Sequence, residues 1–294
     1  MTLPRFGLFL SQANKPLGQV YDEFAMAEDL GFDHAWLVDH LIDTDGPPSY
    51  PMLEAWTLLA ALAARTSRIR LGVLVTSNTF RHPALLLKAA VNVDHISGGR
   101  LILGLGAGWH ADEHRRYGIP LPEPAERVDR FAEAVELISL LMAHERTTYA
   151  GRFYQLDDAP LEPRPTQSPR IPILIAAHRP RMLRLAAAYA DQWDTFAASP
   201  DTATDGVQTE LAERIRYLDD ACRAIGRDPA EIRRSTWAKA ESALKDESAY
   251  IDFVTHHQAL GFTDFSTTAP SPAQMPLLRH LAEQVIPAMR TESS

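Results

Sequence analysis

The order of apolar runs and helical stretches constrains this chain more than any other feature. A short apolar run followed by a stretch of helical periodicity occurs eight times along its 294 residues. Apolar runs without polar alternation are typical of parallel strands that helices cover on both faces. The predicted strands are Arg5–Leu10, His34–Val38, Ile69–Val75, Arg100–Gly104, Ile171–Ala176, Gln192–Phe196, Ile232–Ala238 and Thr263–Thr268.

Eight strand–helix units is the number that closes a (β/α)8 barrel, the TIM barrel fold. We therefore predict an α/β protein of this fold that forms one domain over residues 1–294. Residues 147–169 hold several prolines and aromatic residues, which predicts a hairpin insertion after the fourth helix. The alternative fold is a doubly wound open sheet, which usually has fewer strands at this length.

Charge and cysteine content exclude several classes of function. Lys and Arg number 29 and Asp and Glu number 38, so the net charge is −9. Nucleic acids and anionic membranes are therefore not expected as partners, because binding them needs a basic face. The single cysteine, Cys222, excludes an intramolecular disulfide. Without a signal-peptide run or a stretch of about 18 apolar residues, we expect a cytoplasmic protein with a small-molecule substrate.

Active sites of (β/α)8 barrels lie at the C-terminal ends of the strands, which directs attention to the residues that follow each strand. His40 follows the second strand and is the best titratable candidate, because histidine titrates near neutral pH. Its neighbour Asp39 could orient the ring. A histidine with a purely structural role is the alternative.

Small residues and a helix start mark a second candidate region. Gly106-Ala107-Gly108 follows the fourth strand and Ala176-Ala177 follows the fifth, so a flat or phosphorylated ligand could approach the backbone closely there. His178-Arg179 stands at the start of a helix, where free N–H groups and an arginine suit a phosphate. A solvated loop position for Arg179 is the alternative.

Two motifs in this part of the chain carry little weight. Gly104-Leu105-Gly106-Ala107-Gly108 has the spacing GxGxG rather than the GxGxxG of dinucleotide-binding proteins. Residues 110–114 fit the H-x-x-E-H pattern of some zinc peptidases, but no clear third ligand follows. We expect no metal and interpret residues 110–114 as a solvated polar stretch.

A series of segments over nearly the whole chain carries a family pattern. The segments are Gly31–Asp33, Leu37–His40, Trp56–Ala63, Leu71–Thr76, Phe80–Ala84, Ile96–Leu101, Gly104–Trp109, Tyr149–Tyr154, Pro172–Ile175 and Ala190–Trp193. In this order they resemble the luciferase-like monooxygenase family, and within it the oxidoreductases that use the deazaflavin coenzyme F420.

The resemblance implies a site. His40 would be the catalytic residue beside the reacting edge of the cofactor ring, and a non-prolyl cis peptide would fall at Leu74–Val75. The reaction implied is hydride transfer between coenzyme F420 and a small organic substrate. The residues implied in cofactor binding are Asp39, His40, Leu74, Val75, Thr76, Gly106, Ala107, Gly108, Ala176, Ala177, His178 and Arg179.

Alternatives on the same barrel are a monooxygenase that uses reduced FMN and a non-catalytic protein that binds a flavin or deazaflavin. Related barrels often form dimers, so we expect a homodimer.

Departures from the family pattern bear on the substrate. Sugar-phosphate dehydrogenases of the deazaflavin branch carry an acid after the glycines of the fourth strand and a lysine in the loop after the sixth. Here Trp109 stands at the first position, and residues 196–200 contain no lysine. The prediction is an apolar substrate rather than a sugar phosphate, in a pocket that includes Gln12, Phe80, Trp109 and Phe196.

Overall fold

The architecture is a closed parallel barrel, seen in a computed structural model that describes residues 3–196 and 205–292. Within these ranges eight strands pair side by side in a ring, and the last strand pairs with the first. The predicted TIM barrel is therefore confirmed. The ring runs β1 (Arg5–Phe9), β2 (His34–Leu37), β3 (Arg70–Val73), β5 (Leu101–Gly106), β8 (Ile173–Ala176), β9 (Gln192–Phe196), β10 (Arg233–Ala238) and β11 (Asp264–Thr268).

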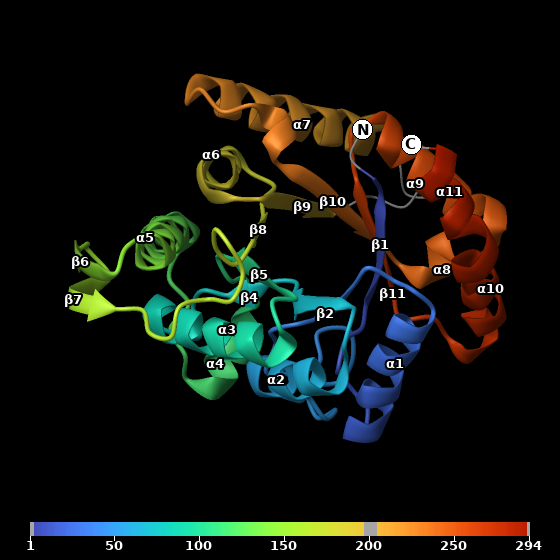
Figure 1. Ribbon diagram of the computed structural model, residues 1–294, viewed down its shortest axis with the longest axis horizontal. Helices are drawn as coiled ribbons and strands as arrows, with labels where there is room; N and C mark the ends of the chain where they lie inside the picture. Colours follow the sequence, from blue (N-terminus) through green and yellow to red (C-terminus); the bar gives the residue numbers. More distant parts are fainter. Residues whose placement is uncertain (1–2, 197–204, 293–294) are drawn as a thin grey trace.

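Helices surround the ring (Figure 1). Pro83 and Pro180 begin two of them at the first helical position, where the missing N–H costs nothing. In the described part of the chain no helix is long and apolar enough to span a membrane. The main helices are α1 (Leu17–Asp29), α2 (Ala55–Arg65), α3 (Pro83–Ser97), α5 (Pro124–Ala143), α6 (Pro180–Tyr189), α7 (Asp205–Ala224) and α9 (Glu247–Ala259).

The last helix and three short helical segments differ from the sequence prediction. The last helix, expected over residues 272–289, is divided into η3 (Pro272–Gln274), α10 (Met275–His280), a π-helical turn η4 (Leu281–Val285) and α11 (Ile286–Glu292). Two short helices, α4 (Ala111–Tyr117) and α8 (Ala240–Ala243), occupy segments without a predicted element, and a 3-10 turn η2 (Pro229–Glu231) precedes β10. These pieces are too short for periodicity to reveal.

The third strand is interrupted where a continuous run, Ile69–Val75, was predicted. β3 ends at Val73, the peptide Leu74–Val75 is cis, and a two-residue strand β4 (Thr76–Ser77) resumes pairing with β5. Gly72 pairs with Ile102 and Thr76 with Leu105, so four steps on one strand match three on the other. One extra residue is thus accommodated as a bulge beside the C-terminal end of β5.

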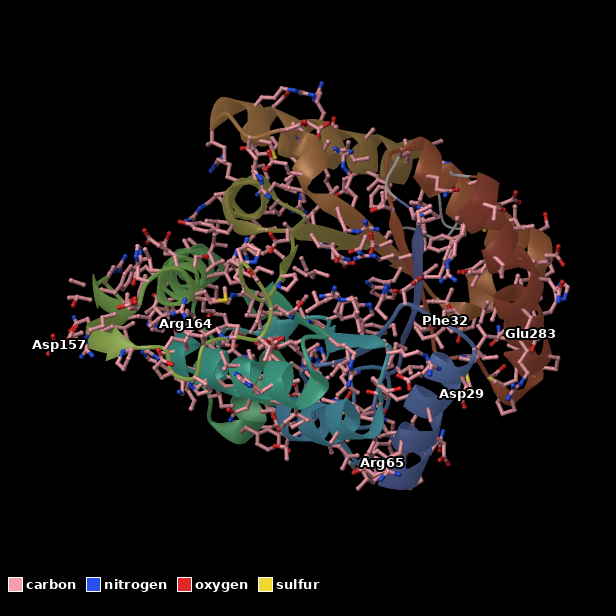
Figure 2. All side chains as sticks on the ribbon, viewed as in Figure 1. Asp29, Phe32, Arg65, Asp157, Arg164 and Glu283 are labelled. Carbon is pink, nitrogen blue, oxygen red and sulfur yellow. The ribbon has the colours of Figure 1, made fainter. Side chains whose placement is uncertain are left out.

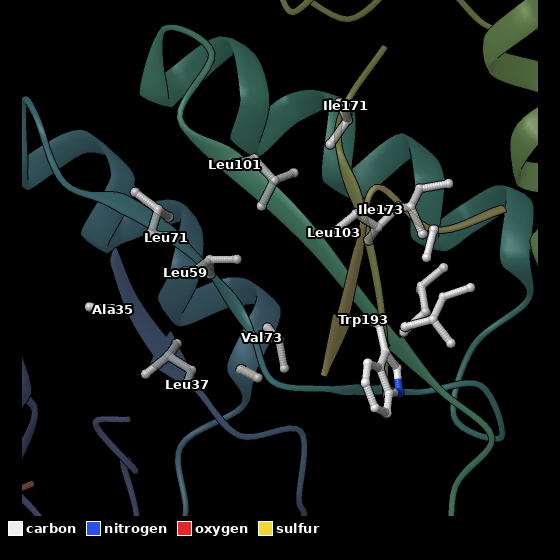
Figure 3. Close-up of a cluster of buried hydrophobic side chains, with 14 of the residues drawn as sticks. Ala35, Leu37, Leu59, Leu71, Val73, Leu101, Leu103, Ile171, Ile173 and Trp193 are labelled. Carbon is white, nitrogen blue, oxygen red and sulfur yellow. The ribbon is translucent and has the colours of Figure 1, made fainter. Parts of the chain in front are cut away.

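Alternate residues of the strands build two separate cores. Leu71, Val73, Leu101 and Leu103 face outward and pack against residues of the helices such as Leu59 (Figure 3). The residues between them face the barrel interior, where Trp36, Leu74, Ile102 and Leu174 form the second cluster. The inner cluster fills the barrel below the strand ends, so a ligand can be accommodated only above it.

Residues 146–160 form an antiparallel hairpin, β6 (Arg146–Ala150) and β7 (Gln155–Pro160), beside α5. It projects from the barrel at the edge of the molecule, where Asp157 points outward (Figures 1 and 2). The Glu133 carboxylate on α5 accepts hydrogen bonds from the backbone N–H groups of Arg152, Phe153 and Tyr154, which attaches the hairpin turn to the helix.

Gly104 permits the close approach of β5 to β3, which gives a testable consequence for stability. A Cβ atom at this position would lie 2.1 Å from the carbonyl oxygen of Val73, and backbone cannot move aside cheaply. We expect Gly104→Ala to lower the free energy of unfolding by about 1–3 kcal/mol, the usual cost of overpacking. The measurement is urea denaturation followed by circular dichroism.

Gly18→Ala is the matched control, because nothing lies within 4 Å of a Cβ atom at this helical position. This variant should be neutral or more stable by up to about 1 kcal/mol. Equal stability of the two variants would contradict the close packing of β3 and β5.

Candidate active site

A cavity of about 590 Å³ opens at the C-terminal ends of the strands. Its volume is within the range of small-molecule and cofactor sites. Most of the predicted site residues lie around it: Asp39, His40, Leu74, Val75, Thr76, Gly106, Ala107, Gly108, Trp109, Ala176, His178 and Arg179. Residues from both halves of the sequence thus meet at one end of the barrel.

Gln12 does not line this cavity, so the prediction that it contacts substrate is wrong. Its side chain is fully buried, and its amide donates to the carbonyl oxygens of Val38 (2.7 Å) and Leu53 (3.0 Å). Its own oxygen accepts the Val38 N–H at 3.2 Å. The amide therefore joins the chain after β1 to the end of β2 and to the segment before α2.

Phe80 and Ala177 also lie away from the cavity. Phe80 packs against the His114 ring, with 5.0 Å between ring centroids, and lines a neighbouring cavity instead. Ala177 is buried in the outer core, where its carbonyl accepts the Trp193 indole N–H at 2.9 Å. Phe196 ends β9, but its side chain and residues 197–200 are outside the described part of the chain.

His40 is held by a carboxylate that was not predicted as a site residue. Its Nδ1 lies 2.9 Å from Oε1 of Glu113, and the Leu41 N–H donates to Oε2 at 2.8 Å. Burial of Glu113 would raise its pKa, but the hydrogen bonds from His40 and Leu41 outweigh burial and hold the pKa below its ordinary value. Glu113 is therefore ionised at neutral pH and accepts the Nδ1–H of His40, which leaves Nε2 as the second ring nitrogen.

The expectation that residues 110–114 are a solvated polar stretch is wrong. They begin helix α4, and this helix buries both Glu113 and His114. His114 Nε2 lies 2.7 Å from the Thr79 hydroxyl, so this pair supports the loop after β4. Gly118 follows the helix in the left-handed region, with φ +67°, and such a terminal glycine after periodic residues is the signal that could have identified α4.

The carboxylate of Asp39 forms hydrogen bonds within the protein and does not point free toward a ligand. Arg81 donates to both carboxylate oxygens, at 2.6 and 3.0 Å, and the Ser77 N–H donates at 2.9 Å. Arg81 also pairs with Glu54 at 2.5 Å. Burial is the largest influence on Asp39 and raises its pKa, although Arg81 acts in the opposite direction. Arg81 lies in the segment Phe80–Ala84 of the family pattern but was not among the predicted site residues, and Glu54 was not identified by any sequence pattern.

Gly106, the last residue of β5, and Gly108 stand where packing leaves no room for a side chain, and they leave a cavity wall without bulky groups. A Cβ atom on Gly106 would lie 2.6 Å from Cγ2 of Val75. Gly108 has φ +86°, and a Cβ there would lie 2.7 Å from the Thr79 hydroxyl oxygen. The Gly108 carbonyl accepts the Arg127 guanidinium at 2.7 Å. The GxGxG motif therefore reflects strand approach and a loop geometry that favours glycine.

The adjacent wall, beyond the end of β8, contains the N-terminus of α6. Arg179 is the N-cap residue, and no side chain of the described residues caps the first turn, so backbone N–H groups there are available to an anion. Burial and the positive charges of Arg214 and Arg179 lower the pKa of His178 to about 4. His178 is therefore neutral at pH 7, and the exposed Arg179 supplies the positive charge at this end.

The Asp39–Arg81 pair predicts a non-additive mutational effect. Arg81→Gln leaves a buried carboxylate without its cation and should lower the free energy of unfolding by about 3–5 kcal/mol. Adding Asp39→Asn removes the stranded charge, so the double variant should recover a large part of that loss. Urea denaturation of the single and double variants measures the coupling. Strict additivity of the two substitutions would show that the pair does not fix the loop after β3.

Comparison of the sequence with known proteins identifies the family of this chain. Residues 1–283 match the sequence profile described as luciferase-like monooxygenase. An "F420-dependent glucose-6-phosphate dehydrogenase" from Microbacterium testaceum (strain StLB037) is 29% identical over 99% of both chains. A "Pyrimidine monooxygenase RutA" from Allorhizobium ampelinum (strain ATCC BAA-846 / DSM 112012 / S4) is 33% identical, over 77% of this chain and 58% of that protein.

A solved structure has the same fold. An "F420-dependent secondary alcohol dehydrogenase in complex with an F420-acetone adduct" superposes with a TM-score of 0.83 at 20% identity, over 98% of this chain and 99% of the other. At that identity the likeness establishes the barrel alone. The profile match extends over almost the whole sequence and includes every barrel strand, and on that basis the chain belongs to the luciferase-like monooxygenase family.

Proposed function

We propose that this protein is an oxidoreductase that transfers a hydride between coenzyme F420 and a small, apolar organic substrate. The observation that carries the proposal is the His40–Glu113 pair at the wall of the strand-end cavity. It presents one ring nitrogen for proton transfer in a cavity of cofactor size. The names of the F420-dependent relatives support the choice of cofactor.

The residues present suit a flat, anionic cofactor. Gly106, Ala107 and Gly108 offer a wall without bulky side chains, and Ala176 on the neighbouring strand β8 extends it. The α6 N-terminus and Arg179 would hold a phosphate, which explains how a chain of net charge −9 can bind an anion. When bound, a deazaflavin supplies two-electron hydride transfer at the carbon that replaces flavin nitrogen 5, and its reduced form reacts poorly with oxygen.

His40 would move the proton that accompanies the hydride. Because ionised Glu113 accepts the Nδ1–H, Nε2 of the neutral ring is a proton acceptor. In the oxidation of an alcohol, the carbon gives up a hydride and the hydroxyl proton passes to Nε2. Glu113 then stabilises the imidazolium, as an adjacent carboxylate does in other histidine bases. Reduction of a carbonyl uses the same groups in reverse.

The lining favours an apolar substrate. Phe9 and Trp237 stack with ring centroids 5.1 Å apart and planes within 6°, and Met52 and Val38 also face the cavity. Trp109, 64% exposed, lies edge-on to His40 with 5.7 Å between ring centroids. Lys239 is the one lysine among the described lining residues, which is little cationic charge for a second phosphate.

Two alternatives are favoured by specific relatives. A sugar phosphate is suggested by the name of the 29% identical relative, and FMN-dependent oxygenation by the family's monooxygenases, such as the 33% identical one. Titration with F420 and with FMN distinguishes the cofactors. A panel of secondary alcohols, ketones and activated alkenes, with glucose 6-phosphate included, then distinguishes the substrate classes.

His40→Ala should lower turnover about 10²–10⁴-fold, the usual contribution of a general acid or base. F420 affinity should change little, because the phosphate contacts are elsewhere. Glu113→Gln should give a smaller loss and shift the pH dependence of kcat, since the imidazolium would lose its ionic partner. Steady-state assays from pH 5 to 9 on the best substrate measure both effects.

His256→Ala is the matched control, since this exposed histidine lies on α9, whose residues do not line the cavity. It should leave turnover unchanged. Full turnover in His40→Ala would remove the proton-transfer role. Tight binding of FMN without binding of F420 would overturn the proposed cofactor.

A further inference from the structure

Asp194 is a buried carboxyl group that faces the cavity from the wall opposite His40. It lies on β9, lines the cavity and is 4% exposed. In the ring of eight strands β9 stands four places from β2, which leads into His40, so the two strands lie across the barrel from each other (Figure 1). The proton chemistry assigned to His40 makes no use of this group.

Among the residues that the structure describes, Asp194 has no cationic partner, unlike the other buried acids near the site. Asp39 pairs with Arg81, Asp264 with Arg233 and Glu113 with His40. Within the described residues Asp194 makes no ion pair, and its recorded side-chain partner is the Ser235 hydroxyl, which donates to Oδ2 at 2.7 Å.

The groups around Asp194 favour its protonated form. The neighbouring strands contribute Ala176 from β8 and Ser235 and Trp237 from β10, none of which is charged. The ionisable group that acts on it is Asp264 on β11, a like charge. Burial raises the pKa of Asp194 to about 7, with Ser235 lowering it and Asp264 raising it further.

We propose that Asp194 is a neutral carboxylic acid that donates a hydrogen bond from Oδ1 to a carbonyl oxygen of the molecule bound in the cavity. Ser235 occupies Oδ2, so Oδ1 is the oxygen left to carry the proton toward the ligand. Identification of that molecule as the deazaflavin or a carbonyl substrate rests on the proposed function. The deazaflavin and a carbonyl substrate would both accept the hydrogen bond through a carbonyl oxygen, and separate measurements distinguish them.

The protonation state is tested on the ligand-free protein. Because the folded-state pKa of about 7 is above the ordinary 3.8, the unfolded chain loses this proton first as pH rises. Asp194 therefore costs stability progressively from about pH 4 to pH 7 and no further above that. Asp194→Asn should gain stability over wild type across that interval and hold a constant difference above it. Infrared difference spectra should show a protonated carboxyl in wild type at pH 6 that Asp194→Asn lacks.

The hydrogen bond is tested by ligand affinity. Fluorescence titration with F420, and with FMN in parallel, should give a wild-type Kd that rises up to about tenfold per pH unit above pH 7, relative to Asp194→Asn. Titration of the cofactor itself is common to both proteins and cancels in that comparison. If the substrate carbonyl is the acceptor instead, the same difference appears in KM and not in Kd.

Asp45→Asn is the matched control, because Asp45 is an exposed acid at the mouth of the same cavity. It should retain the wild-type pH dependence. An ionised Asp194 at pH 6, or identical pH dependence of Kd and KM in wild type and Asp194→Asn, would overturn the proposal. Failure of F420 to bind, with Asp194 still protonated and FMN affinity following its titration, would count against the proposed cofactor alone.

Discussion

The buried carboxylate of Asp39 is the interaction on which the site depends. It holds Arg81 and the Ser77 N–H, and so fixes the loop that follows the bulge between β3 and β5. Its neighbour His40 is thereby placed at the wall of the cavity, where Glu113 on α4 binds the ring. Loss of the Asp39 contacts would release both the cavity wall and the proposed proton-transfer group.

The charges around the cavity are distributed differently from what the net negative charge of the chain suggests. A chain of net charge −9 has an uncapped helix N-terminus and Arg179 at one end of the cavity, where an anion is favoured. At the other walls the charges of the acids are compensated by distinct means: Asp39 pairs with an arginine and Glu113 with a histidine, and the state that we propose for Asp194 is the protonated one. Each of these arrangements avoids an uncompensated buried charge.

The sequence was sufficient to predict the barrel because parallel strands covered on both faces give continuous apolar runs. Gln192–Phe196 matches β9 at both ends, and Pro180–Tyr189 matches α6. The divided C-terminal helix could not be predicted, because a π-helical turn leaves the apolar periodicity almost intact.

A residue's place at the cavity could be predicted where it follows directly from the end of a strand. It could not be predicted where the role of the side chain depends on its hydrogen-bond partners. His40 and Arg179 line the cavity, as their positions after strands predicted. Gln12 was misassigned because a polar side chain at a strand end can bind either a ligand or the protein backbone. Here both the nitrogen and the oxygen of its side-chain amide form hydrogen bonds with the backbone. Glu113 was missed because its role depends on a contact 73 residues away, which no local pattern contains.

A crystal structure of the protein with oxidised F420 would show how the cavity holds the cofactor. We expect the phosphate at the N-terminus of α6, within hydrogen-bond distance of its first-turn N–H groups, and the ring against Gly106–Gly108 with Nε2 of His40 facing its reacting edge. A ring bound elsewhere, or a phosphate away from α6 with His40 turned from the ring, would contradict this expectation.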